Sequence, residues 1–66
     1  MQEEQKGTIE EIIFHNKENG YTVAVFETDT EAFTIVGMIP SPRIGSCYTI
    51  KGEFVTHPTY GEQFSV

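Results

Sequence analysis

The segment CYTIKGEFV at residues 47–55 decides the fold class, because its side chains alternate with a period of two. Apolar residues and a glycine occupy one parity, and polar residues occupy the other: Tyr48, Ile50, Gly52 and Phe54 against Thr49, Lys51 and Glu53. Successive side chains of a β-strand point to opposite faces of the sheet. The segment is therefore predicted to be a strand with one face in the core and the other in solvent.

Four further segments have strand character, and no window has a helical period of useful length. They are residues 7–15, 21–28, 33–37 and 63–66. Residues 21–28 carry apolar side chains on both parities, which is typical of a strand in the middle of a sheet or of one that curves around a barrel. The adjacent Glu10 and Glu11 interrupt the alternation of residues 7–15. This predicts a bulge or a strong coil, which would let one long strand serve two sheets.

The connections carry turn residues, and together with the strands they indicate the fold. Asn19-Gly20 predicts a turn, because both residues tolerate positive φ, within a loop of about four to six residues between the first two strands. We expect a small all-β, five-stranded, antiparallel Greek-key barrel of the OB type, with an SH3-like barrel as the nearest competitor. The helix between strands three and four is expected to be replaced by a Pro-containing loop at 38–46, and the fifth strand to be truncated. Residues 1–6 are then a polar tail, and 7–66 form the domain.

The composition is that of one small globular domain. The 66 residues are 38% hydrophobic and 21% charged, with no apolar run long enough to cross a membrane. The polar start MQEEQK does not resemble a secretory signal, and the single Cys47 cannot form an internal disulfide, so a cytoplasmic location is expected. The formal net charge is −6. Non-specific affinity for nucleic acids comes mostly from Lys and Arg, so we predict weak binding to DNA or RNA.

No catalytic, cofactor or metal site is predicted within the chain. The soft metal ligands His15, Cys47 and His57 lack the close pair that zinc sites usually contain. Neighbouring carboxylates such as Glu10 and Glu11 face opposite sides of a strand, so they are interpreted as solvated surface. Neither of the glycine-rich phosphate-binding motifs is present. The chain by itself is therefore not expected to be an enzyme.

Aromatic side chains could still bind nucleic acid, because OB folds stack the bases of single strands on exposed aromatic rings. The aromatics nearest to strand ends and turns are expected to be the exposed ones, and three of the four cations could lie beside them. The candidate nucleic-acid residues are therefore Lys17, Tyr21, Phe33, Arg43, Lys51 and Tyr60. For each of the three aromatic residues, packing in the core or in a turn is favoured over base stacking.

Two sequence segments indicate a particular protein family and not only a fold class. They are GTIEEIIFHNKENGYTVAVFE at 7–27 and KGEFVTHPTYGEQFSV at 51–66, and IVGMIPSPRIGSCYTI at 35–50 lies between them. Together they resemble the N-terminal OB-fold domain of RecD-like ATP-dependent DNA helicases, often named exodeoxyribonuclease V alpha subunit. The similarity covers residues 7–66, and HPTYGEQF at 57–64 is its most specific string. The positions that carry it are Asn16, Gly20, Gly37, Pro40, His57, Pro58, Tyr60, Gly61 and Phe64.

The resemblance implies that the chain is a fragment of a larger helicase that acts in DNA recombination or repair. In the parent protein, ATP and magnesium would bind in later motor domains, and no catalytic residue of the family carries over to this chain. Only structural positions carry over, and these lie in the first and last turns: Asn16, Asn19, Gly20, His57, Pro58 and Gly61.

Two functions are compatible with this resemblance. In the first, which the negative charge favours, the domain is a scaffolding or interaction module that packs on the helicase or on another repair or replication protein. In the second, it binds single-stranded DNA and guides the strand to the motor. Exposed aromatics next to Lys17, Arg43 or Lys51 would favour DNA, whereas an exposed apolar patch ringed by acids would favour a protein partner.

Overall fold

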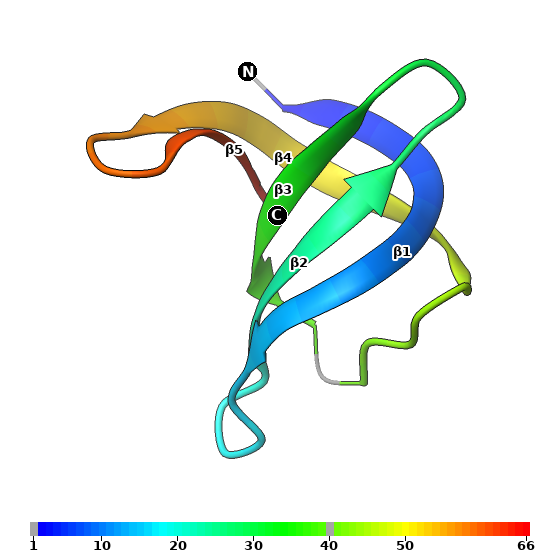
Figure 1. Ribbon diagram of the computed structural model, residues 1–66, viewed down its shortest axis with the longest axis vertical. Helices are drawn as coiled ribbons and strands as arrows, with labels where there is room; N and C mark the ends of the chain where they lie inside the picture. Colours follow the sequence, from blue (N-terminus) through cyan, green and yellow to red (C-terminus); the bar gives the residue numbers. More distant parts are fainter. Residues whose placement is uncertain (1, 40) are drawn as a thin grey trace.

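A computed structural model shows that the chain folds into five strands. The structure describes residues 2–39 and 41–66. The expectation for Pro40 therefore lies outside the described residues. The strands are β1 (Glu3–His15), β2 (Tyr21–Glu27), β3 (Ala32–Met38), β4 (Cys47–His57) and β5 (Gly61–Ser65) (Figure 1). The prediction of an all-β fold is confirmed, and all five predicted segments are strands. The described part of the β3–β4 connection forms turns and bends. Within the described ranges, no helix is long and apolar enough to cross a membrane.

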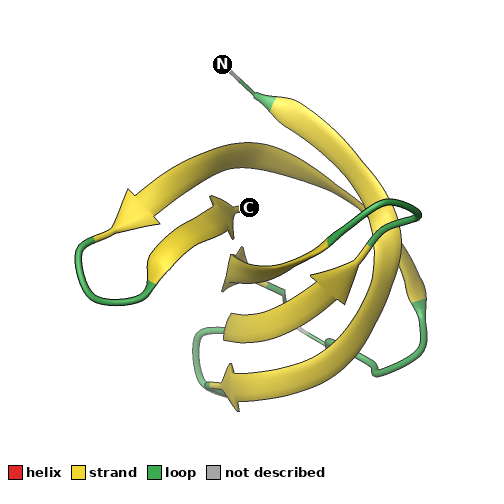
Figure 2. Cartoon of the chain, turned by 45° about the horizontal axis from the view of Figure 1, so that its top comes forward, coloured by secondary structure: helices red, strands yellow, loops and turns green. Residues whose placement is uncertain are grey.

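The strands form a closed ring in the order β1-β2-β3-β5-β4, and β4 pairs with β1 (Figure 2). Neighbouring strands are antiparallel except β3 and β5, which are parallel. The prediction of a wholly antiparallel sheet is therefore wrong. The reason is geometric, because an odd number of strands cannot alternate in direction all the way around a ring. At least one neighbouring pair has to run in parallel.

β1 begins earlier than expected and serves two neighbours. Its first half pairs with β4, from Glu3 opposite Gly52 to Thr8 opposite Cys47, and its second half pairs with β2. Residues 3–6 are thus part of the strand and not of a polar tail. Their side chains are polar, so the alternation of apolar residues that predicts a strand was missing. The strand forms there because the backbone pairs with β4. The register shifts between Ile9 and Glu11, where a bulge was predicted. A second shift, between Ile12 and Phe14, was not predicted.

β5 closes the ring through its C-terminal half. Residues 61–65 pair with β4 on one side, and Phe64 and Ser65 pair with Ile35 and Val36 of β3 on the other. The strand also begins two residues before the predicted position 63. The fifth strand, which was expected to be truncated, therefore has partners on both sides in its C-terminal half.

The core is small and its centre is aromatic. The buried apolar residues are Ile9, Ala24, Phe26, Ile35, Ile50 and Phe64. Phe33 was a candidate for exposure, although packing was favoured over base stacking, and it packs against Phe26, Phe54 and Phe64 with ring centroids 5.9, 5.1 and 5.7 Å apart. The β2–β3 register explains this packing, because it places Phe33 directly opposite the buried Phe26 on the inward face.

Candidate functional site

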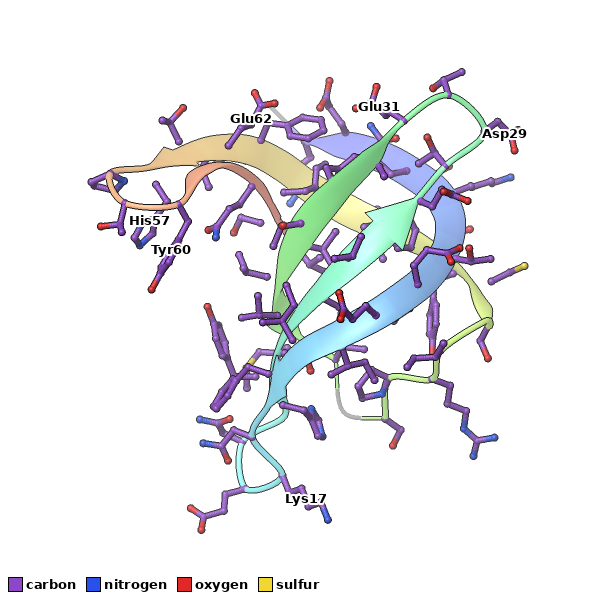
Figure 3. All side chains as sticks on the ribbon, in the orientation of Figure 1. Lys17, Asp29, Glu31, His57, Tyr60 and Glu62 are labelled. Carbon is purple, nitrogen blue, oxygen red and sulfur yellow. The ribbon has the colours of Figure 1, made fainter. Side chains whose placement is uncertain are left out.

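An open hollow of about 490 Å³ lies on the outside of the ring, and we call it the outer hollow. It is lined mainly by apolar and aromatic side chains from the outer face of β1, β2 and β3 and from the β4–β5 hairpin. The lining residues are Ile13, Phe14, Tyr21, Val23, Thr34, Val36, His57, Tyr60 and Gln63. Figure 3 shows His57 and Tyr60 projecting from the same side of the β4–β5 turn.

The strand register explains why apolar side chains collect outside the core. On β2, the even-numbered Thr22, Ala24 and Phe26 are fully buried, so Tyr21 and Val23 must point outward. Val23 lies opposite Phe14 on β1 and Val36 on β3, and this row forms the floor of the hollow. The residues of this row cannot reach the core, and half of the Phe14 surface (51%) remains exposed.

Exposed aromatic rings stand at both ends of the hollow. Phe14 and Tyr21 are in contact at one end, with ring centroids 6.4 Å apart and planes tilted by 56°. His57 and Tyr60 are in contact at the other end, with centroids 4.8 Å apart. Tyr60 is 75% exposed, so its ring is available to a ligand.

The His57 ring holds the β4–β5 turn in place. Its Nδ1 atom accepts hydrogen bonds from the backbone N–H groups of Thr59 and Tyr60, at 3.0 and 3.2 Å. Nδ1 must be unprotonated to accept both, so the neutral ring carries its proton on Nε2. Pro58 lies inside this turn and Gly61 begins the next strand. The same side chain that lines the hollow therefore also fixes the backbone that carries Tyr60.

Replacing His57 by alanine should lower the free energy of unfolding by about 1 kcal/mol, because two backbone donors lose their acceptor. His57→Asn should cost less than half of that, since the Asn side-chain oxygen can accept the same bonds as in an Asx-turn. Urea denaturation followed by circular dichroism measures both variants. Equal losses for alanine and asparagine would contradict the assigned role of Nδ1.

Side chains of the β1–β2 turn fix the other end of the hollow. The Oδ1 atom of Asn16 accepts from the Glu18 N–H, and that of Asn19 accepts from the Tyr21 N–H, both at 2.9 Å. Gly20 adopts a φ of 79°, in the left-handed region that favours glycine. These bonds place Tyr21 at the start of β2, where its ring contacts Phe14.

The structure brings together two of the six predicted nucleic-acid candidates. Tyr21 and Tyr60 line the outer hollow, whereas Lys17, Arg43 and Lys51 do not. Phe33, the sixth, packs against the core. Lys17 lies at the tip of the β1–β2 turn (Figure 3), Arg43 lies in the loop before β4, and Lys51 lies on β4 opposite Glu4. The predicted aromatics and cations are therefore not side by side in the hollow.

Four apolar lining residues were not among the predicted site residues: Ile13, Phe14, Val23 and Val36. The signal that could have found them was present in the sequence, because β1 and β2 carry apolar residues on both parities. On β2, the even-numbered residues supply the core and the odd-numbered Tyr21 and Val23 line the hollow. On β1, two register shifts change which parity faces inward, so the core and the hollow draw on both parities.

The outer face changes from apolar to acidic along the strands. Val25 follows Val23 on the outward parity of β2, and Glu27 follows Val25. Glu11 lies opposite Val25 on β1. Both carboxylates belong to exposed residues. The β2–β3 turn, which continues from this end, adds Asp29 and Glu31 (Figure 3).

No group of three or more His, Cys, Asp or Glu side chains in the described part of the chain could hold a metal ion. Every buried side-chain nitrogen and oxygen atom of these residues has a hydrogen-bond partner. The chemistry of the hollow is therefore that of a surface for apolar and aromatic contact.

Comparison with known families places the chain among domains of one enzyme class. A family model described as "ATP-dependent DNA helicase YrrC, OB-fold domain" matches residues 2–66. No solved structure matches the chain.

Proposed function

Because the chain belongs to the family of OB-fold domains of the ATP-dependent DNA helicase YrrC, we propose that it serves such a helicase as a non-catalytic interaction module. The parent is then a RecD-like enzyme, of the kind named exodeoxyribonuclease V alpha subunit, which acts in recombination or repair in the cytoplasm. Its ATP and magnesium bind in other domains. The OB-fold domain contacts protein through the outer hollow, either on the helicase body or on a repair or replication protein.

The observation that carries this proposal is an apolar hollow whose lining includes neither Lys nor Arg. Exposed apolar patches with aromatic residues are typical of protein interfaces. A phosphate backbone needs cations, which supply most of the non-specific affinity for nucleic acids. Here the net charge is −6, and the carboxylates of Glu11 and Glu27 lie on the same face as the hollow. This charge pattern disfavours a polyanion and favours a protein surface.

A second candidate function, binding of single-stranded DNA, is favoured by the place of the hollow in the fold. OB folds bind oligonucleotides on the face of strands 2 and 3, between the β1–β2 and β4–β5 loops. The hollow lies on that face, and Phe14, Tyr21 and Tyr60 offer rings on which bases could stack. In this alternative, neighbouring domains of the helicase supply the cations that the hollow lacks.

Fluorescence anisotropy of labelled oligothymidylate, titrated with the chain over a salt series, separates the two functions. We expect no saturable binding up to about 100 µM protein at roughly 50 mM salt, because the hollow lacks cations. Micromolar binding that weakens steeply with salt and is lost in Tyr60→Ser would overturn the proposal. Ile44→Ser is the matched control, since Ile44 is 64% exposed and does not line the hollow.

A further inference from the structure

The outer hollow and the acidic end of the same face together define the chemistry of a partner. We propose that they bind one extended segment of a partner protein, with apolar side chains at one end and Lys or Arg at the other. This inference rests on the proposed function as an interaction module and specifies what such a module binds.

The length of the face sets the length of the segment. Tyr21 borders the hollow, and Glu27 lies six positions further along the same outward parity of β2. At about 3.3 Å per residue, this distance is roughly 20 Å, which about six or seven extended residues span. Apolar residues of the segment would contact the row of Phe14, Val23 and Val36, and its basic residues would lie near Glu27.

Charge complementarity selects basic residues for the second end. Glu11 and Glu27 lie on the face, and Asp29 and Glu31 follow in the β2–β3 turn. Lys6 is the cation that lines a separate depression together with Glu27 and Asp29. Four carboxylates and one ammonium group leave this end negative. Such a surface attracts Lys and Arg and repels an acidic segment.

An open backbone edge beside the hollow favours an extended conformation of the segment. β3 pairs with β5 only at Ile35–Phe64 and Val36–Ser65 among the described residues. Residues 32–34 of β3 therefore pair with β2 alone, and residues 61–63 of β5 pair with β4 alone. Peptides commonly add a strand to such an edge, with main-chain bonds that supply affinity and side-chain pockets that supply specificity. The open edge of β3 begins next to the acidic Glu31 and ends at Thr34, which lines the hollow.

Panning of a random peptide display library against the chain tests this directly. Peptides of about 12 residues are roughly twice as long as the face requires. The expected result is enrichment of sequences with alternating apolar residues followed by Lys or Arg. Absence of enrichment, or enrichment of acidic sequences, would overturn the inference.

Variants of the chain then locate the binding of one enriched, fluorescently labelled peptide. Tyr60→Ser and the double variant Glu11→Gln/Glu27→Gln should each weaken binding by about tenfold or more. The matched controls are Ile44→Ser for the apolar change and Glu3→Gln for the charge change, since neither Ile44 nor Glu3 lines the hollow. N-methylation of alternate backbone amides of the peptide should also abolish binding, because it removes donors for the open edge. Equal affinities in the site and control variants would place the binding elsewhere and overturn the inference.

The outcomes separate this inference from the proposed function. If neither peptides nor oligothymidylate bind, the extended-segment inference fails, while a role in packing on the helicase body still stands. If oligothymidylate binds with micromolar affinity through Tyr60, the proposed function itself fails. Binding of peptides alone, with the variant pattern above, supports both.

Discussion

Replacing Gly52 by alanine is expected to lower the free energy of unfolding by about 3 kcal/mol or more. A Cβ atom at this position would collide with the carbonyl oxygen of Ser65 and lie only 2.9 Å from the Cα atom of Val66. Both neighbours are backbone atoms, so no side-chain rotation relieves the overlap. Gly52 is also the last residue of β4 that pairs with β1, just before β4 passes to β5. The ring of strands therefore closes by bringing the backbone of Ser65 and Val66 close to Gly52.

The expected size of this effect follows from the small total stability. A domain of 66 residues has a free energy of unfolding of about 3–10 kcal/mol, and a steric insertion of this kind costs about 3 kcal/mol or more. Urea denaturation followed by circular dichroism gives the value. Gly45→Ala is the matched control, because Gly45 has a φ of 84° but no atom within 4 Å of the added Cβ, and it should lose only about 1 kcal/mol. Equal losses at the two glycines would contradict the assigned crowding.

Replacing Phe64 by alanine is expected to cost about 3–5 kcal/mol, which is the usual range for a buried phenylalanine. The Phe64 side chain is fully buried, and its ring contacts Phe33 and Phe54 with centroids 5.7 and 5.0 Å away. It also lies in the one parallel pair of the ring, opposite Ile35. The variant thus removes core volume at the point where β3 and β5 close the fold.

Tyr60→Ala supplies the comparison for Phe64→Ala. Tyr60 is 75% exposed, so its loss should change the free energy of unfolding by about 0.5 kcal/mol or less. Denaturation of both variants in urea measures the difference. If Tyr60→Ala destabilised the chain as much as Phe64→Ala, the Tyr60 ring would be a structural element, and its assignment to a binding surface would be contradicted.

The fold was predictable where the side-chain pattern alternates. Residues 47–55 predicted β4, and Asn19-Gly20 predicted the first turn, because both signals are local. The parallel β3–β5 pair was not predictable from such signals, since it depends on which strands meet when the ring closes. Phe33 shows the same limit, because only the register against β2 decides that its ring faces inward.

The candidate site was only partly predictable. Tyr21 and Tyr60 were identified because they lie beside turns, and the structure places both in the hollow. Phe14 and Val23 were missed as site residues, because apolar residues on both parities of a strand are also explained by burial on two sides. The cations Lys17 and Arg43 were expected near the aromatics, but their position depends on the path of the loops, which local pattern does not determine.

We propose that the outer hollow is a surface for protein and not for nucleic acid. Amide-resolved NMR of the labelled chain, titrated with the enriched peptide and separately with oligothymidylate, tests this claim most directly. We expect the peptide to shift the amide signals of Phe14, Tyr21, Val23 and Tyr60, and oligothymidylate to leave them unchanged. Shifts of these signals by oligothymidylate, with peptide-induced shifts absent or confined to other surfaces, would contradict it.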